Sequence, residues 1–240
     1  MLRKPNLISF TGADDNVNVS DLVILSRRFP AIEWGILYHP EKEGQTRNPT
    51  AAWRESFLEH PFRSTAIHLC GEQVFRELLG DNDTTLRHIC RYERVQVNIN
   101  ARQQTFNREE IKGVYDRLLT CGHPVILQYH DTSAETIQWY LSQLDDRRRS
   151  LVQILFDSSR GKGISPTGWP KPLKDPQAPD EYMYCGYAGN LGPGNIRDEI
   201  TRIQEASAEH PLGYWIDMES GVRYQNQFSM VKVTQTMNGI

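Results

Sequence analysis

Eight short runs of β-branched and aromatic residues, recurring about every 30 residues, constrain the fold of this chain more than any other feature. The runs begin near residues 6, 31, 64, 92, 124, 151, 181 and 213, and turn residues bound each of them, as is typical of strands. A segment with helical spacing of apolar residues follows most of these runs. This alternation predicts a parallel sheet, because a parallel connection needs a covering helix.

The number of strand–helix units selects one architecture. Eight units within 240 residues match a single (β/α)8 TIM barrel, which usually needs about 250 residues. A doubly wound open sheet is the alternative. The chain has no linker-like or low-complexity tract, so we predict one domain spanning residues 1–240. After the sixth strand, residues 159–181 hold five of the 13 prolines and no apolar stripe, which predicts a short or irregular sixth helix.

Four helices carry start signals in the sequence. Ser20 precedes Asp21, Asn107 is followed by Glu109 and Glu110, and Ser133 is followed by Glu135. Pro193 is expected just inside the seventh helix, because proline tolerates the first helical turn. These start residues agree with the helices that the spacing of apolar residues predicts.

Charge and cysteine content limit the partners and the compartment. Lys and Arg number 27 against 30 Asp and Glu, so a net charge of -3 gives no general attraction for nucleic acid or for anionic lipid. No stretch approaches the roughly 18 apolar residues of a membrane span. The four cysteines include no C-x-x-C pair, so we expect reduced thiols in a cytoplasmic protein.

Polar residues close most of the predicted strands, where the reacting groups of a barrel of this kind lie. They are Thr11, Asp14, His39, Arg47, His68, Gln96, Asn98, Gln128, His130, Asp131, Asp157, Arg160, Asn190, Asp217 and Glu219. Asp157 directly follows the apolar run LVQILF, and a carboxyl partly removed from water there suits proton donation near neutral pH. The alternative is that Asp157 caps the next turn.

Two glycine-bearing turns follow the last two strands, AGNLGPGN at 188–195 and ESGVR at 219–223. Backbone N–H groups in such turns, together with a helix N-terminus, are suited to surround a phosphate. Each turn alone is equally compatible with an ordinary tight turn.

The order of these motifs resembles the phosphoribosylanthranilate isomerase family, which catalyses an Amadori rearrangement. ISFTG resembles the family's K-I-C-G, and GILYHPEKEGQTRNP resembles its G-x-x-F-x-x-x-S-x-R-x-x-x-P. ILFDSSRGKGISPTGW resembles its L-L-D strand with the loop G-G-T-G-x-x-F-D-W. AGNLGPGNI and DMESGVR resemble A-G-G-L-x-P-x-N-V and D-V-S-S-G-V-E. The resemblance implies a barrel enzyme of the aldose–ketose isomerase type that binds a phosphorylated or otherwise anionic small molecule.

The resemblance also implies roles for individual residues. Asp157 takes the position of the general acid, Arg47 that of the arginine that meets the substrate carboxylate, and Thr11 that of the catalytic base. Substrate-binding positions fall on Gln96 and Trp169, and phosphate-binding positions fall on Gly189, Asn190, Leu191, Ser220, Gly221 and Val222.

Two departures from the family pattern affect the chemistry. Thr11 stands where the family has cysteine, and a hydroxyl does not ionise near neutral pH as a thiol with a pKa of about 8.5 does. A substitute base has three candidates, Asp14, His39 and His130. Glu219 replaces a serine beside the phosphate position, where a carboxylate repels an anion.

Neither a cofactor nor a metal is indicated. His39, His68 and His130 come from three different strands, and their spacing defines no ligand set. Two functions therefore stand side by side: an isomerase-like enzyme binding a small phosphorylated or anionic ligand, and a diverged barrel without catalysis that serves as a ligand-binding or protein-interaction module. The oligomeric state is not indicated.

Overall fold

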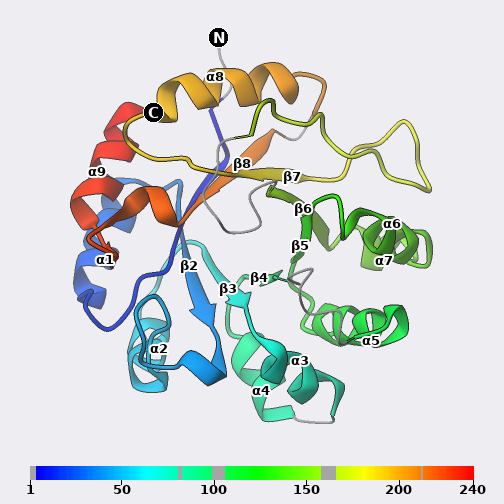
Figure 1. The fold of residues 1–240 in the computed structure, drawn as a ribbon, viewed down its shortest axis with the longest axis horizontal. Helices are drawn as coiled ribbons and strands as arrows, with labels where there is room; N and C mark the ends of the chain where they lie inside the picture. The colour runs from blue at the N-terminus through cyan, green and yellow to red at the C-terminus, as the bar shows by residue number, and fades with distance from the viewer. Residues whose placement is uncertain (1–3, 81–82, 99–105, 158–165, 212) are drawn as a thin grey trace.

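The strands of the computed structural model, which describes residues 4–80, 83–98, 106–157, 166–211 and 213–240, form a closed parallel barrel in chain order (Figure 1). The barrel strands are β1 (Leu7–Thr11), β2 (Ile32–Tyr38), β3 (Thr65–Leu69), β4 (Arg94–Val97), β5 (Val125–Tyr129), β6 (Val152–Asp157), β7 (Cys185–Ala188) and β8 (Tyr214–Met218). Pairing of β1 with β8 closes the ring, with Ser9 opposite Asp217. The predicted (β/α)8 barrel is confirmed, and the open sheet is excluded.

Helices surround the barrel in Figure 1. They are α1 (Val19–Arg28), α2 (Ala51–Leu58), α3 (Glu72–Leu79), α4 (Asp83–Ile89), α5 (Arg108–Leu119), α6 (Ala134–Ser142), α7 (Asp146–Arg149), α8 (Ile196–Ala206) and α9 (Met230–Gly239), with short 3-10 turns η1 (Pro40–Lys42) and η2 (Ser220–Val222). A two-stranded hairpin, β9 (Arg223–Tyr224) and β10 (Gln227–Phe228), follows η2. The sequence analysis missed α4 and the hairpin.

The sixth unit lacks a regular helix in its described part, as predicted. Residues 166–184 run as an irregular segment in which Lys174 and Tyr182 form an isolated bridge. The rest of that loop, residues 158–165 with Arg160, lies outside the described residues. Proline at five positions removes backbone donors and fixes φ, which prevents a continuous helix here.

Side chains alternate between two environments along each strand, and this alternation decides which residues face the barrel interior. Outward-facing Phe10, Trp34 and Ile67 are fully buried against the helix layer. Burying an aromatic or branched side chain of this kind contributes roughly 1.5–3 kcal/mol. The main hydrophobic core therefore lies between the sheet and the helices.

The barrel interior holds a second, smaller apolar cluster formed by Ile126, Leu155, Ala188 and Trp215. Gly186 allows the Trp215 ring to fill the centre, since a Cβ there would lie 2.0 Å from the ring. The rest of the interior is unusually polar.

Two predicted helix starts require correction. The helix starts at Asn107 and Ser133 are confirmed, since these residues are the N-caps of α5 and α6. At Asn107 the structure adds a capping box: the Asn107 side chain accepts from the Glu110 N–H, and the Glu110 carboxylate accepts from the Asn107 N–H. Helix α1, however, begins at Val19 with Asn18 as the cap, so Ser20 already lies inside it. Pro193 lies in the turn before Asn195, the N-cap of α8.

The expectation of four reduced thiols is wrong. Cys90, after α4, and Cys121, after α5, form a disulfide with a Cα–Cα distance of 5.2 Å and 31 residues of separation. The pair was missed because α4 was missed, and α4 brings Cys90 to the base of α5. Cys70 and Cys185 are free.

No helix in the described ranges is long and apolar enough to cross a membrane.

Candidate active site

A cavity of about 70 Å³ lies at the mouth of the barrel, where the strands end. Its lining includes most of the predicted site residues: Gln96, Asp157, Gly189, Asn190, Leu191, Ser220 and Gly221. Five further polar side chains also line it: His68, Asn98, Gln128, Asp217 and Glu219. The barrel therefore brings the ends of six strands to one cavity.

Asp157 ends β6 and is buried, with only 4% of its surface exposed. The Gln128 side chain on β5 donates a hydrogen bond from Nε2 to Asp157 Oδ2 at 2.6 Å. Asp157 pairs in register with Ala188, and Ala188 pairs with Asp217 on the next strand. Two strand spacings of about 4.8 Å place the two aspartates about 10 Å apart along the rim.

Thr11 is joined to Asp217 across the seam that closes the barrel. Thr11 Oγ1 donates to Asp217 Oδ1 at 2.7 Å, and both residues are buried. The threonine hydroxyl in the predicted base position thus touches a carboxyl that can itself titrate.

Burial, the largest effect, raises the pKa of Asp217 to about 7. The hydrogen bond from Thr11 opposes this effect, while the nearby charges of Glu219, Glu33 and Asp157 raise the pKa further. A carboxyl with this pKa exists in both protonation states near neutral pH. Asp217 therefore has the property expected of a general acid or base.

His68 on β3 also lines the cavity and is 2% exposed. Burial lowers the pKa of the imidazole to about 3, and the neighbouring Arg94 guanidinium adds to this effect. The ring is therefore neutral at physiological pH. Gln96 pairs in register with His68, and its side chain donates to Asn98 at 2.8 Å.

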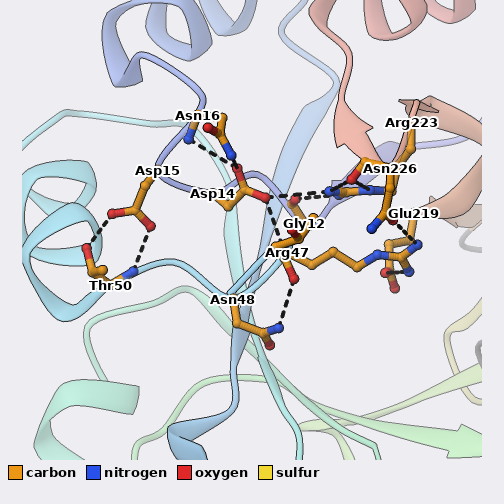
Figure 2. Close-up of polar contacts among 11 residues, drawn as sticks. Gly12, Asp14, Asp15, Asn16, Arg47, Asn48, Thr50, Glu219, Arg223 and Asn226 are labelled. Carbon is orange, nitrogen blue, oxygen red and sulfur yellow. Dashed lines mark hydrogen bonds and ion pairs between the residues drawn. The ribbon is translucent and has the colours of Figure 1, made fainter. Parts of the chain in front are cut away.

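Arg47 lies at the rim of the mouth and binds another side chain (Figure 2). Its Nη1 donates to Glu219 Oε1 at 2.5 Å, and its Nη2 donates to Asn226 at 3.1 Å. Its backbone adopts a φ of 77°, held by a hydrogen bond from its N–H to Asp14 at 2.7 Å. The arginine that was predicted to bind a substrate carboxylate thus binds a carboxylate of the protein itself.

The three substitute bases proposed from the sequence lie outside the lining of the mouth cavity. Asp14 is held by the Arg47 backbone, by Asn16 and by an ion pair with Arg223 at 3.5 Å. His39 faces Glu41 at 3.2 Å. His130 contacts the Thr132 hydroxyl and lines a separate cavity.

The two glycine-bearing turns pack directly against each other. A Cβ at Gly221 would lie 1.8 Å from the carbonyl oxygen of Leu191, so only glycine allows this approach. A Cβ at Gly192 on the first turn would lie 3.0 Å from the carbonyl oxygen of Gly221, a looser but still tight contact. Val222, predicted to bind phosphate, is fully buried and does not line the mouth cavity.

Trp169 lies at a second cavity of about 630 Å³, together with Tyr129 and Phe156. Its ring packs edge-on against Tyr187, and its Nε1 donates to Glu199 at 2.7 Å. Phe156 faces the helix layer, opposite in direction to Asp157. Trp169 is therefore not part of the mouth lining, and its role in substrate binding stays a prediction.

Sequence reasoning placed Asp217, His68 and Gln128 at strand ends but assigned them no catalytic role. The strand alternation could have shown that these three side chains face the barrel interior, since each lies two residues along its strand from another inward-facing residue. The choice among them needed the register between strands.

A closed ring of eight parallel strands with a polar mouth at their carboxyl ends defines the class of this protein: it is a (β/α)8-barrel protein. Solved structures of this class include two similar ones. N-(5'-phosphoribosyl)anthranilate isomerase from Pyrococcus furiosus has a TM-score of 0.55 and 14% identity, over 97% of both chains. The tryptophan synthase complex of the same organism includes a chain with a TM-score of 0.52 and 12% identity, over 92% of this chain and 90% of that one.

These similarities establish the fold. No family model matches the sequence, and no curated protein matches it.

Proposed function

We propose that this protein is an isomerase of the aldose–ketose type that transfers a proton within a small phosphorylated or otherwise anionic sugar-like molecule. The observation that carries the proposal is the Thr11–Asp217 hydrogen bond at the mouth, on the same rim as Asp157. Asp217 supplies the titratable group that a threonine in the base position lacks.

In the proposed reaction Asp217 is the base and Asp157 the acid. The Asp217 carboxylate takes the proton from the carbon next to the substrate carbonyl or imine. The electron pair of the broken C–H bond forms a carbon–carbon double bond, and the displaced π pair moves to the heteroatom, which takes a proton from Asp157. Two groups on separate strands are required because the two proton transfers occur at different atoms.

Thr11 positions Asp217 in this scheme. Its hydroxyl donates to one carboxylate oxygen at 2.7 Å, which leaves the other oxygen for the substrate. The same hydrogen bond favours the charged form of Asp217, which is the form that removes a proton.

Backbone N–H groups of the turns at 189–191 and 220–221 are proposed to hold the anionic group, because both turns line the mouth cavity. Glu219 opposes an anion there, and its ion pair with Arg47 reduces that opposition. We expect Glu219→Gln to bind ribose 5-phosphate about tenfold more tightly than the wild type, since the change removes a negative charge and releases Arg47. Isothermal titration calorimetry measures the Kd, and unchanged binding would argue against phosphate at these turns.

Solvent exchange tests the chemistry before the substrate is known. Ribose 5-phosphate and glucose 6-phosphate are incubated with the protein in D₂O, with xylose as the uncharged control, and loss of the C2 proton signal is followed by NMR. The wild type is expected to exchange at least one of the two sugar phosphates, and Asp217→Asn is expected to exchange it on the order of 10²- to 10³-fold more slowly. Asp180→Asn, an exposed change away from the mouth, is the matched control.

Thr11→Val tests whether Thr11 positions Asp217 or only contributes to packing. Loss of the hydroxyl should raise the pH midpoint of exchange, because the hydrogen bond that lowers the pKa of Asp217 disappears. Exchange in wild type that is unaffected by Asp217→Asn would remove Asp217 from the mechanism.

The second function, a barrel without catalysis, is favoured by the small mouth cavity and by the tight packing of Gly221 on Leu191. It predicts that no sugar exchanges and that Asp157→Asn behaves as the wild type in ligand-binding assays.

A further inference from the structure

His68 is the buried polar group at the mouth that the proposed acid and base leave unused. It is 2% exposed, lines the cavity, and within the described part of the chain its ring makes no hydrogen bond. Such a group in a cavity wall is placed to bind something that enters the cavity.

Gly35 on β2 lets the side chains of Thr11 and His68 pack closely against its backbone. A Cβ at Gly35 would lie 2.2 Å from Thr11 Oγ1 and 2.9 Å from His68 Nε2. Both atoms therefore lie within 3 Å of one point, and Thr11 Oγ1 in turn binds Asp217. His68 Nε2 thus lies in the immediate neighbourhood of the proposed base.

The neighbouring amides are already engaged. Gln96 Nε2 donates to Asn98, and Gln128 Nε2 donates to Asp157. Below His68, Arg94 is 4% exposed, and its three guanidinium nitrogens are buried without a hydrogen-bond partner. Burial keeps the imidazole neutral, and the Arg94 guanidinium adds to this effect because it would face a second positive charge.

We propose that His68 is a further catalytic residue: its Nε2–H donates a hydrogen bond to the carbonyl oxygen of the substrate while Asp217 removes the proton from the adjacent carbon. This inference rests on the proposed function and names the oxygen-binding group of that site. The imidazole gives up no proton and takes none; its hydrogen bond strengthens as negative charge develops on the oxygen.

Two substitutions at His68 measure this role in the D₂O exchange assay. His68→Leu removes the donor, and we expect exchange to fall on the order of 10²- to 10³-fold, mainly in kcat. His68→Gln retains an N–H donor, and we expect it to recover part of that loss. The pH midpoint of exchange, which Asp217 sets, should be the same in His68→Gln as in the wild type. The neutral imidazole places no charge near that carboxyl, so its replacement leaves the pKa unchanged. His123→Gln, a change outside the mouth lining, is the matched control.

A structural role for His68 would give a different pattern. His68→Gln and His68→Leu would then lose exchange equally and in proportion to a fall in Tm, and that result would overturn the proposal. Exchange within threefold of wild type in His68→Leu would overturn it as well.

NMR of ¹⁵N-labelled imidazole tests the contact without turnover. In Asp217→Asn, titration with ribose 5-phosphate or glucose 6-phosphate is expected to shift the His68 Nε2–H signal, while the His123 signal stays unchanged. A shift without exchange in the wild type would leave His68 as a ligand contact and refute the isomerase function. No shift with any of the panel sugars would refute the His68 contact itself.

Discussion

At the scale of single residues, burial at the mouth of the barrel shifts the pKa values of two titratable groups in opposite directions. Burial raises the pKa of Asp217 to about 7 and lowers the pKa of His68 to about 3. The physical cause is the same, because burial disfavours the charged form of either group. The result is a carboxyl that exchanges protons near pH 7 beside an imidazole that stays neutral.

The raised pKa of Asp217 predicts how stability depends on pH. The native carboxyl binds its proton up to about pH 7, whereas the unfolded one releases it near 3.8, so the native state loses stability as pH rises from about 4 to 7. The loss is at most about 4 kcal/mol, at 1.36 kcal/mol for each pKa unit. We expect Asp217→Asn to remove this slope, as measured by urea unfolding from pH 4 to 8.

The difference between wild type and Asp217→Asn is the quantity to compare, since His68 contributes the opposite sign. Its native pKa lies below the ordinary 6.5, so its contribution to stability is lost as pH falls from about 6.5 to 3. Asp180→Asn should retain the wild-type slope. An identical slope in Asp217→Asn would show that the carboxyl is hydrated in the native protein.

Residue types at the strand ends were readable from the sequence, but their partners were not. Asp157 was identified because an apolar run precedes it, and Gln96 because it lies within a V-Q-V strand. Asp217 meets Thr11 across 206 residues of chain, and only the closing β1–β8 register brings these strands together. Arg47 was expected to face a ligand, and instead the β8 turn presents Glu219 to it.

At the scale of elements, periodicity located the strands well because each is a short apolar run between turns. The helix start at Asn107 depends on equally local residues and was predicted correctly. Helix α4 was missed because DTTLRHI has few apolar residues and is only seven residues long. Its helical state depends on packing, with Thr85 and Ile89 buried.

The Cys90–Cys121 disulfide ties α4 to the end of α5 and should stabilise this side of the barrel. A loop of 31 residues gives an expected contribution of about 3–4 kcal/mol through restriction of the unfolded chain. Urea unfolding with and without dithiothreitol measures it. The double variant Cys90→Ala with Cys121→Ala is expected to have the same free energy of unfolding as the reduced wild type. Dithiothreitol should not change its stability.

Equal stability of the oxidised and reduced wild type would mean that the cross-link adds nothing to the packing of α4 on α3 and α5.

At the scale of the whole molecule, the barrel interior carries charge where apolar layers are usual. Glu33 accepts hydrogen bonds from Ser9 and Ser64, and Arg94 approaches it at 3.6 Å. The Arg94 guanidinium also lies over the Trp215 ring, 4.4 Å from its centroid. This buried pair forms the polar floor beneath His68 and the mouth.

A double-mutant cycle tests whether Arg94 and Glu33 in this polar floor stabilise the protein through their interaction with each other. Arg94→Met alone should destabilise the protein by about 3–5 kcal/mol, because it leaves Glu33 buried and charged. Adding Glu33→Gln should restore at least about 1 kcal/mol of that loss. The free energies of unfolding come from urea titrations at pH 7. Strict additivity of the two changes would show that the charges are screened by internal water.

The sequence by itself determined the eight strand–helix units, and with them the closed parallel barrel, because alternation of short apolar runs and helical stripes is a local property of the chain. It also determined that polar groups end the strands. Only the tertiary structure decided which of these groups meet, since that depends on strand register and on barrel closure. The Thr11–Asp217 contact, the approach of His68 to Thr11 at Gly35 and the ion pair of Arg47 with Glu219 all join residues far apart in the chain, whose distances no local pattern encodes.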